Sequence, residues 1–146
     1  MAVVTVQRHV ARPIGRVWEL ACDFQALRLP LTHVDSGAGS PGVGWRFVGV
    51  SGFGPVAIRD PMLVTRWRPP APGSPSAEYA VVKTGWVLAG WAEVTLTELG
   101  PSLTRLQWRE EIVLRPRVVG AALARATDIA VRAMFERAVD DLVRRA

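Results

Sequence analysis

The sequence predicts an α+β domain in which an antiparallel sheet curls around one long carboxy-terminal helix. Most of the chain from residue 45 to 114 reads as short runs of alternating polar and apolar residues, separated by Gly, Pro and Ser. This pattern is typical of antiparallel strands. From about Arg117 to Arg144, apolar residues instead recur at helical spacing. A sheet that curls around a helix usually encloses a cavity. The sequence therefore predicts a pocket more clearly than it predicts a reaction.

The chain has 146 residues, 49% of them hydrophobic, which fits a single folded domain over residues 1–146 with a real core. No apolar stretch reaches the roughly 18–20 residues needed to span a bilayer, and the first residues lack the pattern of a signal peptide. A single cysteine, Cys22, suits a reducing compartment. We therefore expect a cytoplasmic protein without a transmembrane segment, either a monomer or a homodimer.

The net charge is +5, and Arg accounts for all basic residues except Lys83. Nucleic-acid binding would require these arginines to cluster with aromatic residues on one face. They are spread along the chain instead, alternating with apolar residues on strands or with acids on the last helix. We expect no nucleic-acid partner.

The amino-terminal part predicts one strand and two short helical pieces. Val3–Val10 alternates as a strand, with Arg8 interrupting its apolar face. A short helix follows, with Pro13 in its first turn, where the missing N–H has no consequence. A second helical piece is expected over Asp23–Leu27, and residues 33–42 read as a loop by composition.

Six further strands and the last helix complete the expected secondary structure. On the last helix, two apolar faces are candidates for packing against the sheet. One carries Val119, Leu123, Ala126, Ala130, Ala133 and Met134, and the other Val131, Phe135, Ala138 and Leu142. The strands are expected at Trp45–Ser51, Val56–Asp60, Met62–Trp67, Glu78–Thr84, Trp91–Leu99 and Thr104–Leu114.

Several familiar chemistries are missing from the sequence. There is no P-loop motif, and the Gly-rich stretch 37–44 precedes a strand, whereas a phosphate cradle needs the start of a helix. Two histidines, His9 and His33, with the lone Cys22 do not suggest three or four converging metal ligands. We expect no metal and no cofactor.

Two carboxylates fall on apolar strand faces and are the candidates for chemistry. Glu110 shares its face with Leu106, Trp108 and Ile112, and Asp60 continues an alternation of apolar residues. A buried carboxylate must pair, accept hydrogen bonds or stay protonated, and a raised pKa would suit proton transfer. The structural alternatives are an ion pair between Arg8 and Glu110 and, for Asp60 before Pro61, a turn or bulge.

Six tryptophans are the other signal, since large aromatic side chains fill cores and also line small-molecule pockets. We expect Trp18 and Trp67 to pack in the core. Some of Trp45, Trp91 and Trp108 are expected to line the cavity.

Three local strings resemble one superfamily. Residues 10–20 (VARPIGRVWEL) are similar to the strand-to-helix entry of START-like, or SRPBCC, proteins; residues 64–70 (VTRWRPP) resemble a strand ending in Trp-x-Pro-Pro; residues 100–111 resemble the penultimate hairpin and last strand. The resemblance covers the whole chain and looks closest to polyketide cyclase/dehydrase-like members. It implies a START/Bet v 1-like helix-grip fold: seven antiparallel strands around the carboxy-terminal helix, two short helices closing one end, and an apolar cavity.

Fold alone does not decide function, and the matched strings are packing elements. The expected function is binding of a small hydrophobic or aromatic, lipid- or polyketide-like molecule in the cavity. The alternative is a cofactor-independent cyclase or dehydrase that orients such a ligand, with Glu110 or Asp60 as the catalytic acid or base; a third possibility is an interaction module with a filled cavity. The residues expected to line the site are Phe24, Leu27, Trp45, Phe47, Ile58, Arg59, Met62, Tyr79, Val81, Trp91, Trp108, Ala130 and Met134.

Overall fold

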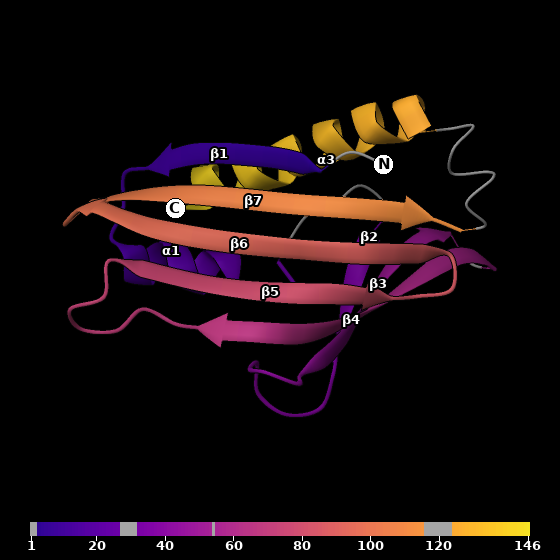
Figure 1. The fold of residues 1–146 in the computed structure, drawn as a ribbon, viewed down its shortest axis with the longest axis horizontal. Coiled ribbons are helices and arrows are strands. Elements are labelled where there is room, and N and C mark those ends of the chain that lie inside the picture. Colours follow the sequence, from indigo (N-terminus) through magenta and orange to yellow (C-terminus); the bar gives the residue numbers. More distant parts are fainter. Residues whose placement is uncertain (1–2, 27–31, 54, 116–123) are drawn as a thin grey trace.

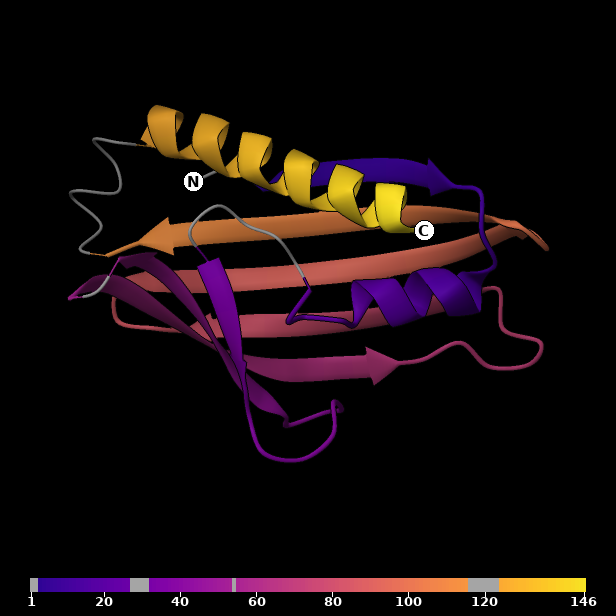
Figure 2. The same cartoon turned by 180° about the vertical axis from the view of Figure 1, so that it is seen from behind.

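The computed structural model describes residues 3–26, 32–53, 55–115 and 124–146. Seven strands form one antiparallel sheet in the order β1-β7-β6-β5-β4-β3-β2 (Figure 1). The two helices within the described residues lie on the same face of that sheet, as Figure 2 shows from behind. The elements are β1 (Val4–Val10), α1 (Ile14–Ala21), β2 (Thr32–Ser36), β3 (Arg46–Phe53), β4 (Val56–Arg68), β5 (Ser76–Thr84), β6 (Leu88–Gly100), β7 (Leu103–Leu114) and α3 (Ala124–Arg145).

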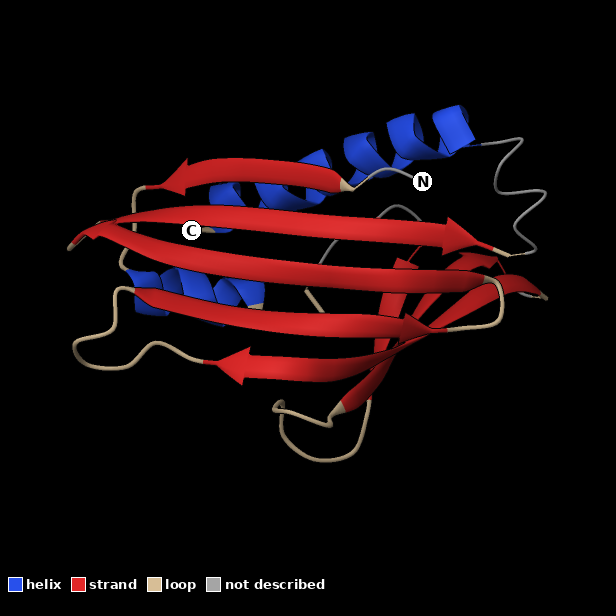
Figure 3. Cartoon of the chain, in the orientation of Figure 1, coloured by secondary structure: helices blue, strands red, loops and turns tan. Residues whose placement is uncertain are grey.

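The predicted α+β architecture is confirmed, with strands and helices in separate layers (Figure 3). The predicted loop at residues 33–42 is partly wrong, because β2 occupies its beginning and pairs with β3 through Val34 and Gly49. The expected second helix is also wrong for its described part, since residues 24–26 form a turn. Its last residue, Leu27, lies outside the described residues.

The two strands predicted on either side of Pro61 are one continuous strand, β4. Proline is tolerated there because the pairing of β4 with β5 begins only at Met62 and Lys83. Pro61 therefore lies where no ladder hydrogen bond to β5 is required of its missing N–H. Residues 56–61 of β4 pair with β3 alone along the register that we describe, and Figure 2 shows β2, β3 and this part of β4 turning away from the long strands.

The long helix uses the second of its two candidate faces. Val131, Phe135 and Leu142 are buried against the sheet, whereas Ala130 and Ala133 are exposed. The bulkier side chains remove more apolar area from water, which favours that orientation. The predicted first face is therefore wrong for Ala130 and Ala133, and its members at 119, 123 and 126 lie outside the residues whose side chains are described.

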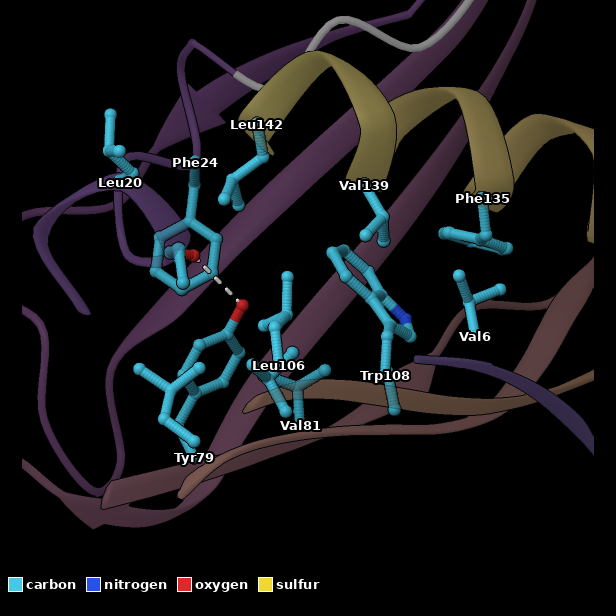
Figure 4. Packing of buried hydrophobic residues seen from close by; sticks show 14 of the residues in the cluster. Val6, Leu20, Phe24, Tyr79, Val81, Leu106, Trp108, Phe135, Val139 and Leu142 are labelled. Atoms are coloured by element: carbon cyan, nitrogen blue, oxygen red, sulfur yellow. Dashed lines mark hydrogen bonds between the residues drawn. The ribbon is translucent and has the colours of Figure 1, made fainter. Parts of the chain in front are cut away.

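The end of the sheet that carries α1 is closed by packed aromatic rings. Trp18 meets Trp67 edge to face with ring centroids 5.1 Å apart, and both pack against the core as predicted. Tyr79 donates a hydrogen bond from its hydroxyl to the Ala21 carbonyl at 3.0 Å (Figure 4). Phe24, which follows α1, stacks on Phe47 of β3 at 4.7 Å. These contacts fill the space between α1 and the sheet at this end.

Candidate functional site

A cavity of about 120 Å³ lies between the sheet and α3, towards the end of the sheet away from α1. An engineered apolar cavity of about 150 Å³ holds benzene, so the space is on the scale of one small ring. Its wall is mainly apolar and takes residues from β2 to β7 and from α3. Five aromatic side chains contribute to it: Phe24, Phe47, Tyr79, Trp108 and Phe135.

Three charged side chains meet in this otherwise apolar wall. Period-two alternation turns Lys83 inward on β5 beside Tyr79 and Val81, and it does the same for Asp60 on β4 and Glu110 on β7. Lys83 Nζ lies 2.6 Å from Asp60 Oδ2 and 3.2 Å from Glu110 Oε1. The side chains of Asp60, Lys83 and Glu110, here called the buried triad, are only 11%, 6% and 2% exposed.

Neighbouring side chains complete the surroundings of the buried triad. Trp108 donates its indole N–H to Glu110 Oε2 at 3.0 Å, so both carboxylate oxygens of Glu110 are engaged. The Met62 sulfur lies 3.8 Å from Lys83 Nζ. Asp60 Oδ1 is buried and has no hydrogen-bond partner among the described residues. A buried acceptor without a partner lowers the stability of the fold. Packing alone therefore does not explain why Asp60 lies at this position.

Burial and charge act in opposite directions on the buried triad. Desolvation raises the pKa of Glu110, and the attraction of the Lys83 ammonium and the hydrogen bonds from Lys83 and Trp108 offset only part of this rise. Desolvation would lower the pKa of Lys83, but the charges of Glu110 and Asp60 outweigh it and raise that pKa. Lys83 is therefore a stable ammonium ion, and Glu110 is the group of the two that can hold a proton closer to neutral pH.

The structure brings nine of the predicted site residues to the cavity and leaves five elsewhere. Trp45 is buried behind Phe24 and Phe47, Trp91 points to the outer face of the sheet, and Ala130 is exposed on α3. Leu27 lies outside the described residues. The residues at the cavity are Phe24, Phe47, Asp60, Met62, Tyr79, Val81, Trp108, Glu110 and Met134.

The other two misplaced residues are on β4. Ile58 has the inward parity but is 41% exposed, because it lies in the part of the strand beyond its pairing with β5. Arg59 has the opposite parity, and its side chain is 65% exposed beside Asp35. The alternation is therefore right for β4, while the extent to which α3 and the sheet cover that strand required the three-dimensional structure.

The predicted ion pair between Arg8 and Glu110 is wrong. Their strands are neighbours, but Glu110 lies opposite Val4 and Arg8 lies opposite Leu106. Four residues along a strand separate them by about 13 Å. Arg8 instead binds Asp140 of α3 through its Nε at 2.8 Å, and the partner of Glu110 is Lys83.

Lys83 is the residue that sequence reasoning missed. Two signals for it were present: it is the only lysine in a chain whose other basic residues are all Arg, and it continues the inward alternation of Tyr79 and Val81. The cavity also includes Val34, Gly49, Leu88 and Ile112, apolar or small residues that carry no distinguishing pattern.

Comparison with known families identifies the chain. The family model described as polyketide cyclase/dehydrase and lipid transport matches residues 1–146. The chain belongs to this family. No curated protein matches the chain. Among the described residues no group of His, Cys, Asp and Glu side chains could hold a metal ion, and no helix there is long and apolar enough to cross a membrane.

Solved structures of related fold agree with this membership of the polyketide cyclase/dehydrase and lipid transport family. TTHA0849 from Thermus thermophilus superposes with a TM-score of 0.75 at 16% identity, covering 99% of this chain and 96% of that one. The ZhuI aromatase/cyclase from Streptomyces sp. R1128 gives 0.68 at 16% identity, covering 99% and 94%. Norcoclaurine synthase from Thalictrum flavum gives 0.59 at 12% identity, covering 97% and 93%. At these identities the likeness establishes the helix-grip fold.

Proposed function

We propose that this protein binds a small hydrophobic or aromatic molecule in the cavity between the sheet and α3. The observation that carries the proposal is the composition of the cavity wall, in which aromatic rings surround one compact charged group. Small-molecule sites typically combine an apolar lining with a few placed polar groups that orient the ligand.

The buried triad favours a binding role over a purely structural one. Replacing a buried ion pair with packed apolar residues is often neutral or stabilising, so such a group is weak evidence for stability. Here two carboxylates share one ammonium, and Asp60 Oδ1 lacks a partner among the described residues. That arrangement costs folding free energy and offers polar groups to a molecule in the cavity.

A second candidate function is cyclase or dehydrase chemistry on such a ligand. The specific support is Glu110, whose pKa is raised by burial at the cavity wall. A carboxylic acid held near its pKa at working pH can donate and recover a proton. Lys83 and the Trp108 indole hold the two Glu110 oxygens and so fix the direction in which its proton would be offered. The aromatase/cyclase named above shares this fold.

Native mass spectrometry of the protein purified from its own source, beside a denatured control, tests the binding proposal. A co-purifying apolar or aromatic molecule would support it and define the ligand class. Calorimetric titration with single-ring compounds such as toluene and indole is the complementary measurement on emptied protein. Failure of both, with the protein folded, would contradict the proposal.

The matched variants Glu110→Gln and Glu111→Gln separate the two functions once a ligand is known. Glu110 lies at the cavity, whereas the adjacent Glu111 accepts a hydrogen bond from Trp91 on the outer face. An enzyme is expected to lose turnover in Glu110→Gln but not in Glu111→Gln, with binding kept in both. If the protein only binds its ligand, the molecule recovered from the wild-type protein and from both variants should be chemically unchanged.

A further inference from the structure

The Lys83 ammonium has one N–H that is poorly used. An ammonium carries three donors, and two of them are directed to Asp60 Oδ2 at 2.6 Å and Glu110 Oε1 at 3.2 Å. The remaining acceptor that the described residues offer is the Met62 sulfur at 3.8 Å. A thioether is a weak acceptor. The third N–H of the Lys83 ammonium therefore has only a weak hydrogen-bond partner.

We propose that Lys83 is the ligand anchor of the cavity and that its third N–H binds the carbonyl oxygen of a neutral ring-bearing ligand in place of the Met62 sulfur. This rests on the proposed function, because it requires a molecule in the cavity, and it adds the class of that molecule. Both Met62 and Lys83 line the cavity. In the proposed complex a ligand oxygen takes the position beside the ammonium that the Met62 sulfur holds at 3.8 Å.

Met62 is suited to give way to such an oxygen. Its unbranched side chain has three rotatable bonds and adapts its packing at low cost. A hydrogen bond from a charged donor to an oxygen is stronger than one to a thioether, and burial away from water increases the difference. Replacing the sulfur with a carbonyl oxygen as the acceptor therefore strengthens binding. A ligand with a carbonyl group should bind more tightly than a hydrocarbon of the same shape.

The charge of the buried triad determines which oxygen-bearing ligands are accepted. With both carboxylates ionised, the triad carries one net negative charge, and the raised pKa of Glu110 reflects the cost of burying it. A ligand carboxylate would bring a second uncompensated negative charge into a site shielded from water. The cavity is thus selective for neutral carbonyl compounds against carboxylates.

Three single-ring probes with the same number of non-hydrogen atoms and closely similar shapes test this selectivity. They are acetophenone, the hydrocarbon α-methylstyrene and the anion benzoate, titrated calorimetrically into the wild-type protein at pH 7. We expect acetophenone to bind about tenfold or more tightly than α-methylstyrene, the scale of one hydrogen bond to a charged group, and benzoate to bind most weakly. Equal binding of ketone and hydrocarbon, or benzoate binding as tightly as the ketone, would overturn the proposal.

The single lysine allows the contact itself to be observed without mutation. Because Lys83 is the only lysine, protein labelled with [¹⁵N]lysine at Nζ gives one side-chain ammonium signal. Acetophenone should shift this signal, and α-methylstyrene should leave it nearly unchanged at equal occupancy. A preference for the ketone without a shift of the Nζ signal would mean that another group binds the oxygen, and would sink the assignment to Lys83.

The variant Met62→Leu distinguishes the two neighbouring groups. It removes the sulfur at similar volume and leaves the ammonium, so the preference for acetophenone should persist; its loss would assign recognition to Met62. If the ketone and the hydrocarbon bind wild-type protein equally, the anchor is wrong while the binding proposal stands. If neither binds, while indole and toluene also fail, both proposals are wrong.

Discussion

Strand β7 carries two adjacent glutamates that make nearly the same hydrogen bond on opposite faces of the sheet. Glu110 accepts the Trp108 indole N–H at 3.0 Å inside the fold, and Glu111 accepts the Trp91 indole N–H at 2.9 Å outside it. Each pair also has a cation nearby. Inside it is Lys83, 3.2 Å from Glu110, and outside it is Arg109, whose guanidinium lies 5.5 Å from the centre of the Trp91 ring.

The comparison shows that burial, more than the choice of partners, determines what such a group can do. Arg109 is 46% exposed and pairs with the partly exposed Glu93 at 3.3 Å, where water screens the charges. Lys83 is 6% exposed, and its loss would leave carboxylates that water cannot reach. Burying the inner pair therefore costs folding free energy and raises the pKa of Glu110. The outer pair has the properties of an ordinary surface contact.

Removing the cation should give the largest difference in stability between the inner and the outer pair. We expect Lys83→Met to lower the free energy of unfolding by about 3–5 kcal/mol, because it leaves buried carboxylates without their counter-charge. The matched outer variant Arg109→Met should cost no more than about 1 kcal/mol. Urea unfolding at pH 7 measures both. Similar losses in the two variants would mean that the buried triad is better hydrated than its exposure indicates.

Removing the indole donor comes next. Trp108→Phe should cost about 1–3 kcal/mol, since Glu110 Oε2 then stays buried without its donor, whereas water can replace the donor of the half-buried Glu111 in Trp91→Phe. Thermal unfolding of the two variants gives the difference. An outer variant that is as destabilised as the inner one would contradict the assignment of the cost to burial.

The pH dependence of stability should distinguish the two glutamates. The pKa of folded Glu110 lies above its ordinary value of 4.5, so its proton contributes stability that is fully present below pH 4.5 and is lost as the pH rises through the raised pKa. Wild-type protein should therefore lose stability relative to Glu110→Gln as the pH increases from 4.5.

Urea titrations of wild type, Glu110→Gln and Glu111→Gln at several pH values between 4 and 8 provide the measurement. Glu111→Gln serves as the control for removing one negative charge from β7. If the stability difference between wild type and Glu110→Gln stays constant over this range, or changes in the opposite direction, the raised pKa is wrong.

The smallest expected effect on stability comes from filling the cavity itself. A Cβ on Gly49 would lie 3.3 Å from the Met62 terminal methyl group, so Gly49→Ala should reduce the space beside Met62 and weaken binding of a ring-sized ligand several-fold. Gly42→Ala is the control, because its Cβ would meet no atom within 4 Å. Calorimetric titration compares the two, and equal affinities would place the ligand away from Gly49.

Much of this fold follows from local patterns, whereas the site depends on register. Alternation placed Glu110 and Asp60 on the inner face, and turn residues placed most strand ends, because both signals lie within a few neighbouring residues. The partner of Glu110 could not be found in that way. It depended on the four-residue offset between Arg8 and Glu110 across β1 and β7, and on Lys83 of β5, which β6 separates from β7 in the sheet.

The same reasoning explains the misassigned face of α3. The first apolar stripe has six residues and the second has four, so counting residues favours the wrong one. The choice between them depends on side-chain volume and on the space that the curled sheet leaves open, which helical spacing does not report. The core packing of Trp18 and Trp67 was accessible because large aromatic side chains generally bury their area, but their contact with each other was found only in the structure.

The interrupted pairing of β4 has a consequence for motion. From Met62 onward this strand is held by β5, but the segment from residue 56 to 61 is paired along the described register with β3 alone. This tip can bend without breaking the ladder of β5, β6 and β7, but bending also breaks the Lys83–Asp60 ion pair and the hydrogen bond from the Thr84 hydroxyl to the Pro61 carbonyl. Amide hydrogen exchange should therefore resolve two units, with this tip opening at lower free energy than the long strands. Such an opening would separate Asp60 from Lys83, so its free energy would include the loss of a buried ion pair.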